Sequence, residues 1–196
     1  MPNTYATWNP SDKNSNITLS NGNLTATQGA LDGWDSVRST IGVSSGKWYW
    51  EITVNSASGS GVFSSIANTT AALTSYLGAD TNGWGYHAAT GNKFNNGDLG
   101  AYGATYVAGD VIGVALDMDA GTLIFYKNGT SQGTAFTGLS GTFYAGTSLI
   151  LNTTDQVTAN FGASTFSYSV PSGYNSGLYT STPDANHNNL LLLGVG

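Results

Sequence analysis

The sequence contains no cysteine, and only 8% of its residues are charged. The absence of cysteine excludes disulfides, thiol chemistry and thiolate metal sites. Average soluble proteins carry roughly 25% charged residues, so the polar surface of this chain must come from serine, threonine, asparagine and glycine. Glutamate and lysine are strong helix formers, and Glu51 is the only glutamate in 196 residues. The shortage of both residue types argues against helices.

Basic residues are also scarce, and they are scattered along the sequence. The five are Lys13, Arg38, Lys47, Lys93 and Lys127. The net charge is −6 and the pI is near 4.3. Because binding to phosphates needs clustered lysine and arginine, we expect no nucleic-acid partner and no attraction to anionic membranes.

Long apolar runs are also missing. No stretch approaches the roughly 18 apolar residues of a membrane span, so we expect no membrane insertion. The first twelve residues lack the basic start and apolar run of a signal peptide. These absences predict a protein of the cytosol, or one that is assembled in a host cytoplasm and released in another way, as virus particles are.

What the chain does have is a high density of turn signals. Asn-Gly pairs begin at Asn21, Asn82, Asn96 and Asn128, and an Asp-Gly pair begins at Asp32. Such pairs accept positive φ and close tight hairpins. Short β-type runs separate them, at the spacing that is typical of a sandwich or barrel.

Several of these runs have the pattern of particular strands. Residues 47–54 alternate, with Trp48, Trp50, Ile52 and Val54 predicted on one face. Residues 110–116 are continuously apolar, as in a strand buried on both sides. Residues 117–121 would join that strand to 122–127 as a hairpin. The remaining candidates are strands at 143–145, 148–151, 157–161 and 165–168, and a short helical turn within 68–77.

The fold class predicted from this pattern is all-β, either a sandwich or a barrel. Residues 1–171 form one domain with a lead-in over about 1–28, because no linker divides them. A polar extension, 172–196, follows and ends in an apolar segment.

A series of motifs in this order resembles the SPRY family. They are Val37-Arg38-Ser39, Gly46-Lys47-Trp48-Tyr49-Trp50-Glu51-Ile52, Gly83-Trp84-Gly85-Tyr86, Tyr102-Gly103, Gly109-Asp110-Val111-Ile112-Gly113-Val114, Leu116-Asp117, Gly121-Thr122-Leu123, Phe125-Tyr126-Lys127-Asn128-Gly129, Gly133, Ala135-Phe136, and Val157 with Asn160-Phe161-Gly162. The resemblance covers roughly residues 30–170. It implies a two-sheet antiparallel concanavalin-like (SPRY) β-sandwich that recognises partners through loops at one end, without catalysis and without a cofactor.

The end of the domain narrows this expectation. Pro171-Ser172-Gly173-Tyr174 and the Ser/Thr/Asn/Gly composition resemble SPRY domains of bacteriophage tail proteins. We therefore expect a phage virion surface or attachment protein of the tail or capsid. Its partners would be other virion proteins, a host-surface glycan or protein receptor, and further copies of itself in a homo-oligomer. A purely structural decoration or connector protein and a cellular SPRY interaction adaptor are the alternatives.

The candidate ligand-binding residues are mostly aromatics in or near glycine-rich loops. An exposed ring beside asparagine and aspartate suits sugar binding, because it combines apolar stacking with directional polar contacts. The alternative is that these rings cover the ends of the sandwich. The set consists of Trp34, Trp84, Tyr86, His87, Lys93, Tyr102 and Tyr106.

The apolar end of the chain is a second candidate site. Leu190, Leu191, Leu192 and Leu193 precede Gly194-Val195-Gly196. Four adjacent leucines near a terminus reduce solubility unless they are covered. They would form either a last strand of this domain or an assembly anchor that packs into a neighbouring subunit.

Patterns suggesting metal binding or catalysis have simpler explanations. Asp117 and Asp119 alternate as in a calcium loop, but the bidentate glutamate of such loops is missing. A hairpin turn with aspartates that bind backbone N–H groups is the better interpretation.

The acid–base candidates are equally sparse. His87 and His187 are the only histidines, and a hydrolase would need a hydroxyl and an orienting group beside one of them. Asp80 and Asp98 could pair as in a glycosidase, but aspartates that cap turns explain them as well. We therefore predict no catalytic residues, no metal site and no enzymatic activity.

Overall fold

The computed structural model describes residues 3–29, 33–57, 61–150 and 154–181. Every element in this part of the chain is a β-strand, which confirms the predicted all-β class. Within the same residues there is no helical segment with the length and apolar character that a membrane crossing requires.

One layer is an antiparallel sheet of seven strands in the order β10-β9-β8-β7-β14-β5-β2. Its strands are β2 (Trp8–Lys13), β5 (Trp34–Val43), β7 (Val62–Ala67), β8 (Gly83–His87), β9 (Asn92–Phe94), β10 (Asp98–Ala101) and β14 (Phe143–Ile150).

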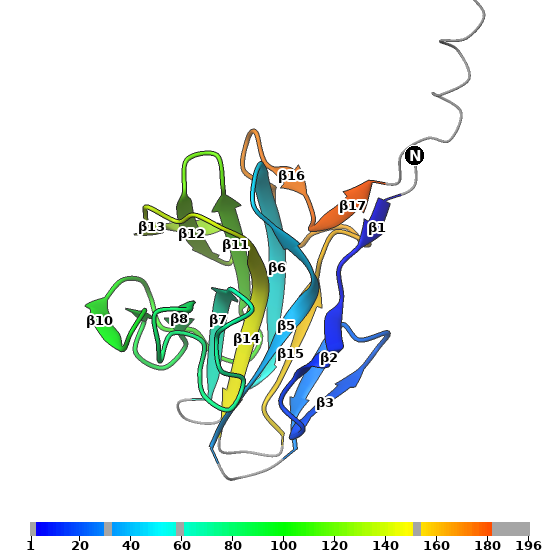
Figure 1. The fold of residues 1–196 in the computed structure, drawn as a ribbon, viewed down its shortest axis with the longest axis vertical. Helices are drawn as coiled ribbons and strands as arrows, with labels where there is room; N and C mark the ends of the chain where they lie inside the picture. Colours follow the sequence, from blue (N-terminus) through cyan, green and yellow to red (C-terminus); the bar gives the residue numbers. More distant parts are fainter. Residues whose placement is uncertain (1–2, 30–32, 58–60, 151–153, 182–196) are drawn as a thin grey trace, which may run out of the picture.

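The other layer has eight strands, of which seven follow the order β13-β12-β11-β6-β15-β4-β3 and the eighth, β16, pairs in parallel with β6. Its strands are β3 (Ile17–Ser20), β4 (Thr25–Gln28), β6 (Lys47–Ser56), β11 (Val111–Asp117), β12 (Thr122–Lys127), β13 (Thr130–Phe136), β15 (Gln156–Asn160) and β16 (Asn175–Ser176). A small third sheet joins β1 (Asn3–Tyr5) to β17 (Tyr179–Ser181), so the two ends of the described chain lie side by side (Figure 1).

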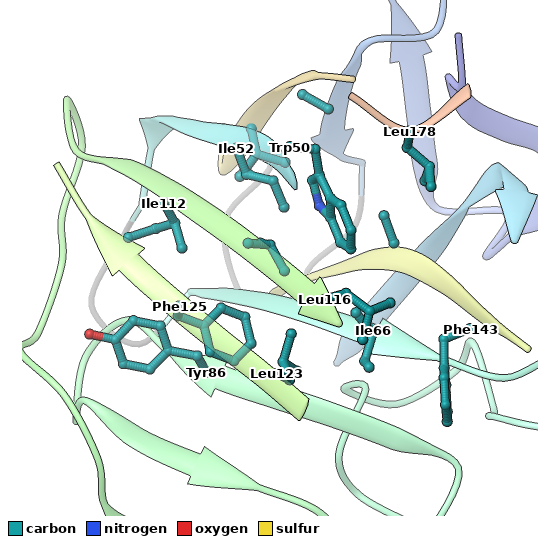
Figure 2. Close-up of a cluster of buried hydrophobic side chains, with 14 of the residues drawn as sticks. Trp50, Ile52, Ile66, Tyr86, Ile112, Leu116, Leu123, Phe125, Phe143 and Leu178 are labelled. Carbon is teal, nitrogen blue, oxygen red and sulfur yellow. The ribbon is translucent and has the colours of Figure 1, made fainter. Parts of the chain in front are cut away.

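The core fills the space between the two layers. Trp50, Ile52 and Val54 of β6 are fully buried there, as the alternating pattern predicts, whereas Trp48 is half-buried at the edge. Figure 2 shows Trp50 and Phe125 among side chains from both sheets. Each large apolar side chain removed from water contributes about 1.5–3 kcal/mol. The core is therefore the main source of stability.

Asn-Gly turns close three hairpins of the fold. Asn21, Asn96 and Asn128 have φ values of 53°, 55° and 48°, and they connect β3 to β4, β9 to β10 and β12 to β13. Asn82 does not have positive φ in this structure. Its pair with Gly83 leads directly into β8, so the predicted hairpin turn at that position is wrong.

Four predicted elements also differ from the structure. The strands expected at 143–145 and 148–151 are one strand as far as residue 150, β14, which lies in the middle of its sheet between β5 and β7, and residue 151 lies outside the described residues. Residues 165–168 form no strand, because backbone N–H groups at Ser167 and Tyr168 bind a side chain instead. Residues 68–77 form turns without helix, because several of their carbonyl groups bind Arg38.

The outer face of β6 is buried as well. Tyr49 is 1% exposed and Glu51 is 2% exposed beneath the segment that follows β15. Glu51 accepts hydrogen bonds from the backbone N–H groups of Ser167 at 2.8 Å and Tyr168 at 2.9 Å. It also accepts one from the Tyr49 hydroxyl at 3.1 Å. The single glutamate of the chain thus attaches a segment without regular structure to the sheet.

Replacing Glu51 with glutamine tests this attachment. Glu51→Gln keeps the size of the side chain but leaves one oxygen to serve two N–H groups, so one of them loses its partner. We expect unfolding free energy to fall by about 1–3 kcal/mol and the amides of Ser167 and Tyr168 to exchange faster with solvent.

Amide hydrogen exchange measured by NMR, together with urea unfolding, checks both effects. Asp98→Asn is the matched control, because Asp98 is an exposed carboxylate that also accepts a backbone N–H, that of Gly100. Unchanged exchange at Ser167 and Tyr168 in Glu51→Gln would contradict the attachment.

The turn between β11 and β12 confirms the hairpin interpretation of the aspartates. Asp117 Oδ1 accepts hydrogen bonds from the backbone N–H groups of Asp119 and Ala120, and Asp119 Oδ1 accepts one from Gly46. Lys47 Nζ lies 2.9 Å from Asp117 Oδ2. Burial favours a raised pKa for Asp117, but the hydrogen bonds from Lys47 and Ala120 outweigh it, so the pKa lies below its usual value.

This lowered pKa predicts how stability depends on pH. A carboxylate with a lowered pKa in the folded state stabilises the fold above its unfolded pKa, and the contribution is lost as the pH falls below about 4. Urea unfolding of the wild type and of Asp117→Asn between neutral and acidic pH measures it. We expect a steeper loss of stability on acidification in the wild type, and two parallel profiles would contradict the prediction.

Candidate functional site

The structure separates the seven predicted ligand-binding residues by the alternation of β8. Trp84 and Tyr86 point into the space between the sheets, where both contact the core. His87 points to the outer face of the seven-stranded sheet, against Phe63. Neighbouring residues of β8 therefore contribute to two different places, the core between the sheets and the outer face of the seven-stranded sheet.

Three of the predicted tyrosines gather on the inner side. Tyr86 and Tyr106 have ring centroids 4.9 Å apart, and Tyr102 packs on Tyr86 at 5.2 Å. Tyr86 is 0% and Tyr106 is 1% exposed. The expectation of exposed rings is corrected for these two, because packing against the core buries them. The alternative, in which rings cover the sandwich, describes them better.

The hydroxyl groups of these tyrosines bind the backbone. Tyr106 donates to the carbonyl of Tyr86 at 2.6 Å, Tyr86 donates to Ala104, and Tyr102 donates to Gly133 at 2.6 Å. Burial raises the pKa of Tyr102 to about 12, and burial also raises the pKa of Tyr86 and of Tyr106. All three therefore remain protonated donors at neutral pH and connect loops to strands.

Trp84 and Lys93 have structural contacts too. The Trp84 ring meets Phe143 edge-on at 4.9 Å. Lys93 Nζ donates to the carbonyl of Ala135 at 2.7 Å and lies 5.5 Å from the centroid of the Phe136 ring. Lys93 thus connects β9 of one sheet to β13 of the other.

The remaining two predicted residues meet three rings that the sequence did not indicate. Phe63 stacks on Tyr76 at 5.0 Å and on His87 at 4.5 Å. Trp34 and Phe94 each meet Phe63 edge-on at 5.0 Å. We call this group, made of Trp34, Phe63, Tyr76, His87 and Phe94, the outer aromatic cluster.

The outer aromatic cluster has a buried floor and an accessible rim. Phe63 is 1% and His87 is 7% exposed, whereas the other three rings are half-buried. His87 Nδ1 lies 2.9 Å from Thr90 Oγ1, a hydroxyl that also accepts the N–H of Asn92 in the following turn. The rim can contact a partner while the floor stays packed.

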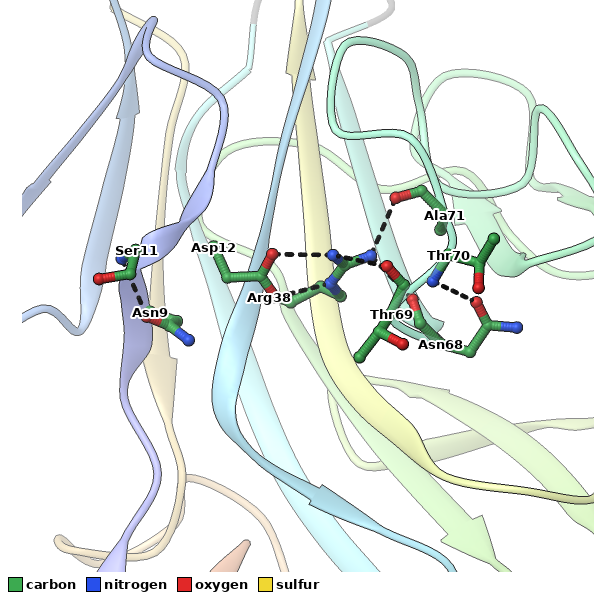
Figure 3. A network of polar contacts seen from close by, with 8 residues as sticks. All are labelled: Asn9, Ser11, Asp12, Arg38, Asn68, Thr69, Thr70 and Ala71. Carbon is green, nitrogen blue, oxygen red and sulfur yellow. Dashed lines mark hydrogen bonds and ion pairs between the residues drawn. The ribbon is translucent and has the colours of Figure 1, made fainter.

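Tyr76 lies in a loop, and a buried cation holds the start of that loop. Arg38 of β5 forms a two-point ion pair with Asp12, with both N–O distances at 2.8 Å. Its other donors reach the carbonyls of Asn68, Thr69 and Ala71 (Figure 3). Because all five donors of the guanidinium group are used, Arg38 fixes the loop between β7 and β8.

The other candidate groups have partners in turns. Asp80 Oδ1 accepts the N–H of Asn82, and Asp98 accepts the N–H of Gly100 and the side-chain amide of Asn92. In the described ranges, no three His, Asp or Glu side chains come together in a way that could hold a metal ion. His187 and Leu190 to Leu193 lie outside the described residues, so the assembly anchor and the homo-oligomer stay predictions.

Replacing Arg38 with lysine tests the support of the loop. The substituted lysine would have three donors on one atom, so Asp12 would lose its two-point contact and at least one carbonyl would lose its partner. We expect Arg38→Lys to lower the unfolding free energy by about 2–4 kcal/mol, because each buried acceptor left unpaired costs about 1–3 kcal/mol.

Urea unfolding measures the change. Lys47→Arg is a matched control, because Lys47 belongs to an ion pair but its side chain is 43% exposed, and a substitution there changes stability by less than about 0.5 kcal/mol. Equal effects of the two substitutions would show that Arg38 does not hold the loop.

Comparison with known proteins identifies a family model and relatives that match this sequence. A family model described as "SPRY domain" matches residues 47–164. Ran-binding protein 9 of Xenopus tropicalis is 35% identical over 177 residues, which cover 83% of this chain and 31% of that protein. F-box/SPRY domain-containing protein 1 of Drosophila persimilis is 31% identical over 147 residues, which cover 69% of this chain and 58% of that protein. The chain thus spans less than two thirds of either relative.

A solved structure agrees on the fold. The SPRY domain of human HERC1 superposes with a TM-score of 0.70 at 24% identity, covering 78% of this chain and 96% of that domain. The predicted concanavalin-like sandwich is confirmed.

The phage interpretation is wrong, because these relatives are proteins of eukaryotic cells. The virion location, the attachment function and the virion decoration alternative fall with it. Low charge and abundant serine, threonine and asparagine describe how the surface is hydrated, and they do not identify a source. The cellular adaptor alternative fits the relatives better.

Proposed function

Because this chain belongs to the SPRY domain family, we propose that it is a cellular protein-interaction module without enzymatic activity. One relative is named for binding Ran, and another combines a SPRY domain with an F-box. These names describe the relatives. They support a role for this chain in bringing a partner protein to an assembly.

The outer aromatic cluster is the observation that carries the proposal. Trp34, Tyr76 and Phe94 offer half-buried rings around a floor formed by Phe63 and His87. Aromatic side chains supply a large contact area with few rotatable bonds, so little conformational entropy is lost when a partner binds. Rings of this kind dominate the binding energy of many interfaces.

The chemistry of the cluster favours one kind of partner. It combines aromatic surface with a single imidazole, and it carries no lysine, arginine or carboxylate. It would accept an apolar or aromatic anchor residue of a peptide segment, while backbone groups of the peptide remain hydrated. Burying such a residue contributes about 1.5–3 kcal/mol.

The polar groups that could serve catalysis support a module without enzymatic activity. The carboxylates of Asp80, Asp98 and Asp117 all accept hydrogen bonds from backbone N–H groups in turns. Their engagement in turns favours binding as the function.

Selection from a library of random peptides tests the proposal. We expect the wild-type protein to enrich peptides with an aromatic or aliphatic anchor. Trp34→Ala and Tyr76→Ala should bind the enriched peptides at least about tenfold more weakly, because each removes roughly 1.4 kcal/mol or more of contact.

Val107→Ser is the control, because Val107 is 63% exposed and lies outside the cluster. Fluorescence anisotropy with the enriched peptides gives the affinities, and the thermal unfolding of each variant confirms that it is folded. Selection of no peptide, or equal binding by Trp34→Ala, would overturn the proposal.

A further inference from the structure

A groove lies on the opposite face of the sandwich from the outer aromatic cluster. The segment that follows β15, residues 162–170, lines this open groove together with Tyr5 of β1 and Ser176 of β16. Figure 1 shows β1, β16 and β17 near one another at one end of the molecule, away from β8 and β10. The groove has a volume of about 750 Å³, and small-molecule sites typically have roughly 300–1,000 Å³.

The residues around the groove carry no charge. They are glycine, alanine, valine, tyrosine, phenylalanine, serine and threonine. An anionic ligand would need lysine or arginine to replace its hydration, and a cationic ligand would need carboxylates. The groove therefore suits a neutral ligand.

Hydroxyl groups give the groove its polar character. Five side chains there form no hydrogen bond with any other described residue, and a hydroxyl can both donate and accept. They are Ser164, Thr165, Ser167, Ser169 and Ser176. A ligand that itself carries several hydroxyl groups is the natural complement, because each of its groups can take either role.

Four backbone groups of the segment already have partners within the domain. The N–H groups of Ser167 and Tyr168 bind Glu51, and the carbonyls of Ser164 and Thr165 accept from the side-chain amide of Asn160. A peptide that adds as a β-strand needs free backbone groups along an edge. These four groups are not available to such a strand, and the groove presents hydroxyl side chains beside them.

The same contacts hold the segment in one conformation. A buried carboxylate and a side-chain amide fix it from beneath, so its hydroxyl groups are positioned before a ligand arrives. Positioned groups lose less entropy on binding. Tyr5 and Phe166 are half-buried at the groove, and they add aromatic surface for the C–H face of a sugar ring.

From these observations we propose that the groove binds a short neutral oligosaccharide. The hydroxyl side chains of the 162–170 segment pair with sugar hydroxyls, and the aromatic rings contact the apolar ring faces. The proposal does not depend on peptide binding at the outer aromatic cluster, because the two sites share no residue and lie on opposite faces.

NMR titration of the full chain tests the proposal. The ¹⁵N-labelled protein is titrated separately with maltotriose, cellotriose and mannotriose, and with trigalacturonate as a charged probe. We expect at least one neutral trisaccharide to cause saturable shifts in the amides of residues 162–170 and Ser176, and trigalacturonate to cause none.

Variants without single hydroxyls identify the contacts. Ser167→Ala removes only the hydroxyl and keeps the backbone bond from residue 167 to Glu51. Ser169→Ala removes a second hydroxyl of the same groove. Each is expected to weaken binding about three- to tenfold, which corresponds to one neutral hydrogen bond. Ser140→Ala removes an exposed hydroxyl elsewhere and should leave the affinity unchanged.

Three results with the sugar probes would overturn the proposal. They are no shifts with any neutral trisaccharide, equal shifts with trigalacturonate, and unchanged affinity in Ser167→Ala and Ser169→Ala. Shifts in the groove caused by the library-selected peptides, in place of sugars, would also overturn it. Failure of peptide binding alone leaves these outcomes unaffected, so the two proposals fail separately.

Discussion

The structure depends on the packing of β6 through both of its faces. Trp50, Ile52 and Val54 fill the core between the sheets, while Tyr49 and Glu51 are buried under the segment that follows β15. In a strand with one face in water, only every second side chain would be buried. Because β6 also pairs with β11, β15 and β16, the hydrophobic core and the outer covering are connected through a single strand.

The few charged residues of the chain act as anchors for loops. Arg38 is buried on the seven-stranded sheet and binds three carbonyls of the loop that leads to Tyr76. Glu51 is buried on the eight-stranded sheet and binds two N–H groups of the 162–170 segment. A buried charge is costly unless it is fully hydrogen-bonded. Both charges meet this condition partly with side chains and partly with backbone groups of loops, and the backbone bonds fix loops that strand pairing does not reach.

These two anchors support the two surfaces with proposed binding roles. One surface is aromatic and has a peptide-like partner as its best complement, and the other is neutral and rich in hydroxyl groups. The low charge of the chain makes both surfaces possible. The same composition led to the incorrect prediction of a phage source. A chain with little charge presents rings and hydroxyls, and this property does not identify the source of the protein.

The sequence by itself determined the all-β class, the Asn-Gly hairpins at residues 21, 96 and 128, the alternation of β6 and the order of motifs that indicates the family. These signals are local, because turn chemistry and period-two burial depend on neighbouring residues. Only the tertiary structure decided that Tyr86 lies inside and His87 outside, and that Phe63, Tyr76 and Phe94 join Trp34. Strands far apart in sequence supply these rings, and a loop whose carbonyls bind Arg38 places Tyr76. Such contacts form only when non-local strands pair, so no local pattern could have indicated them.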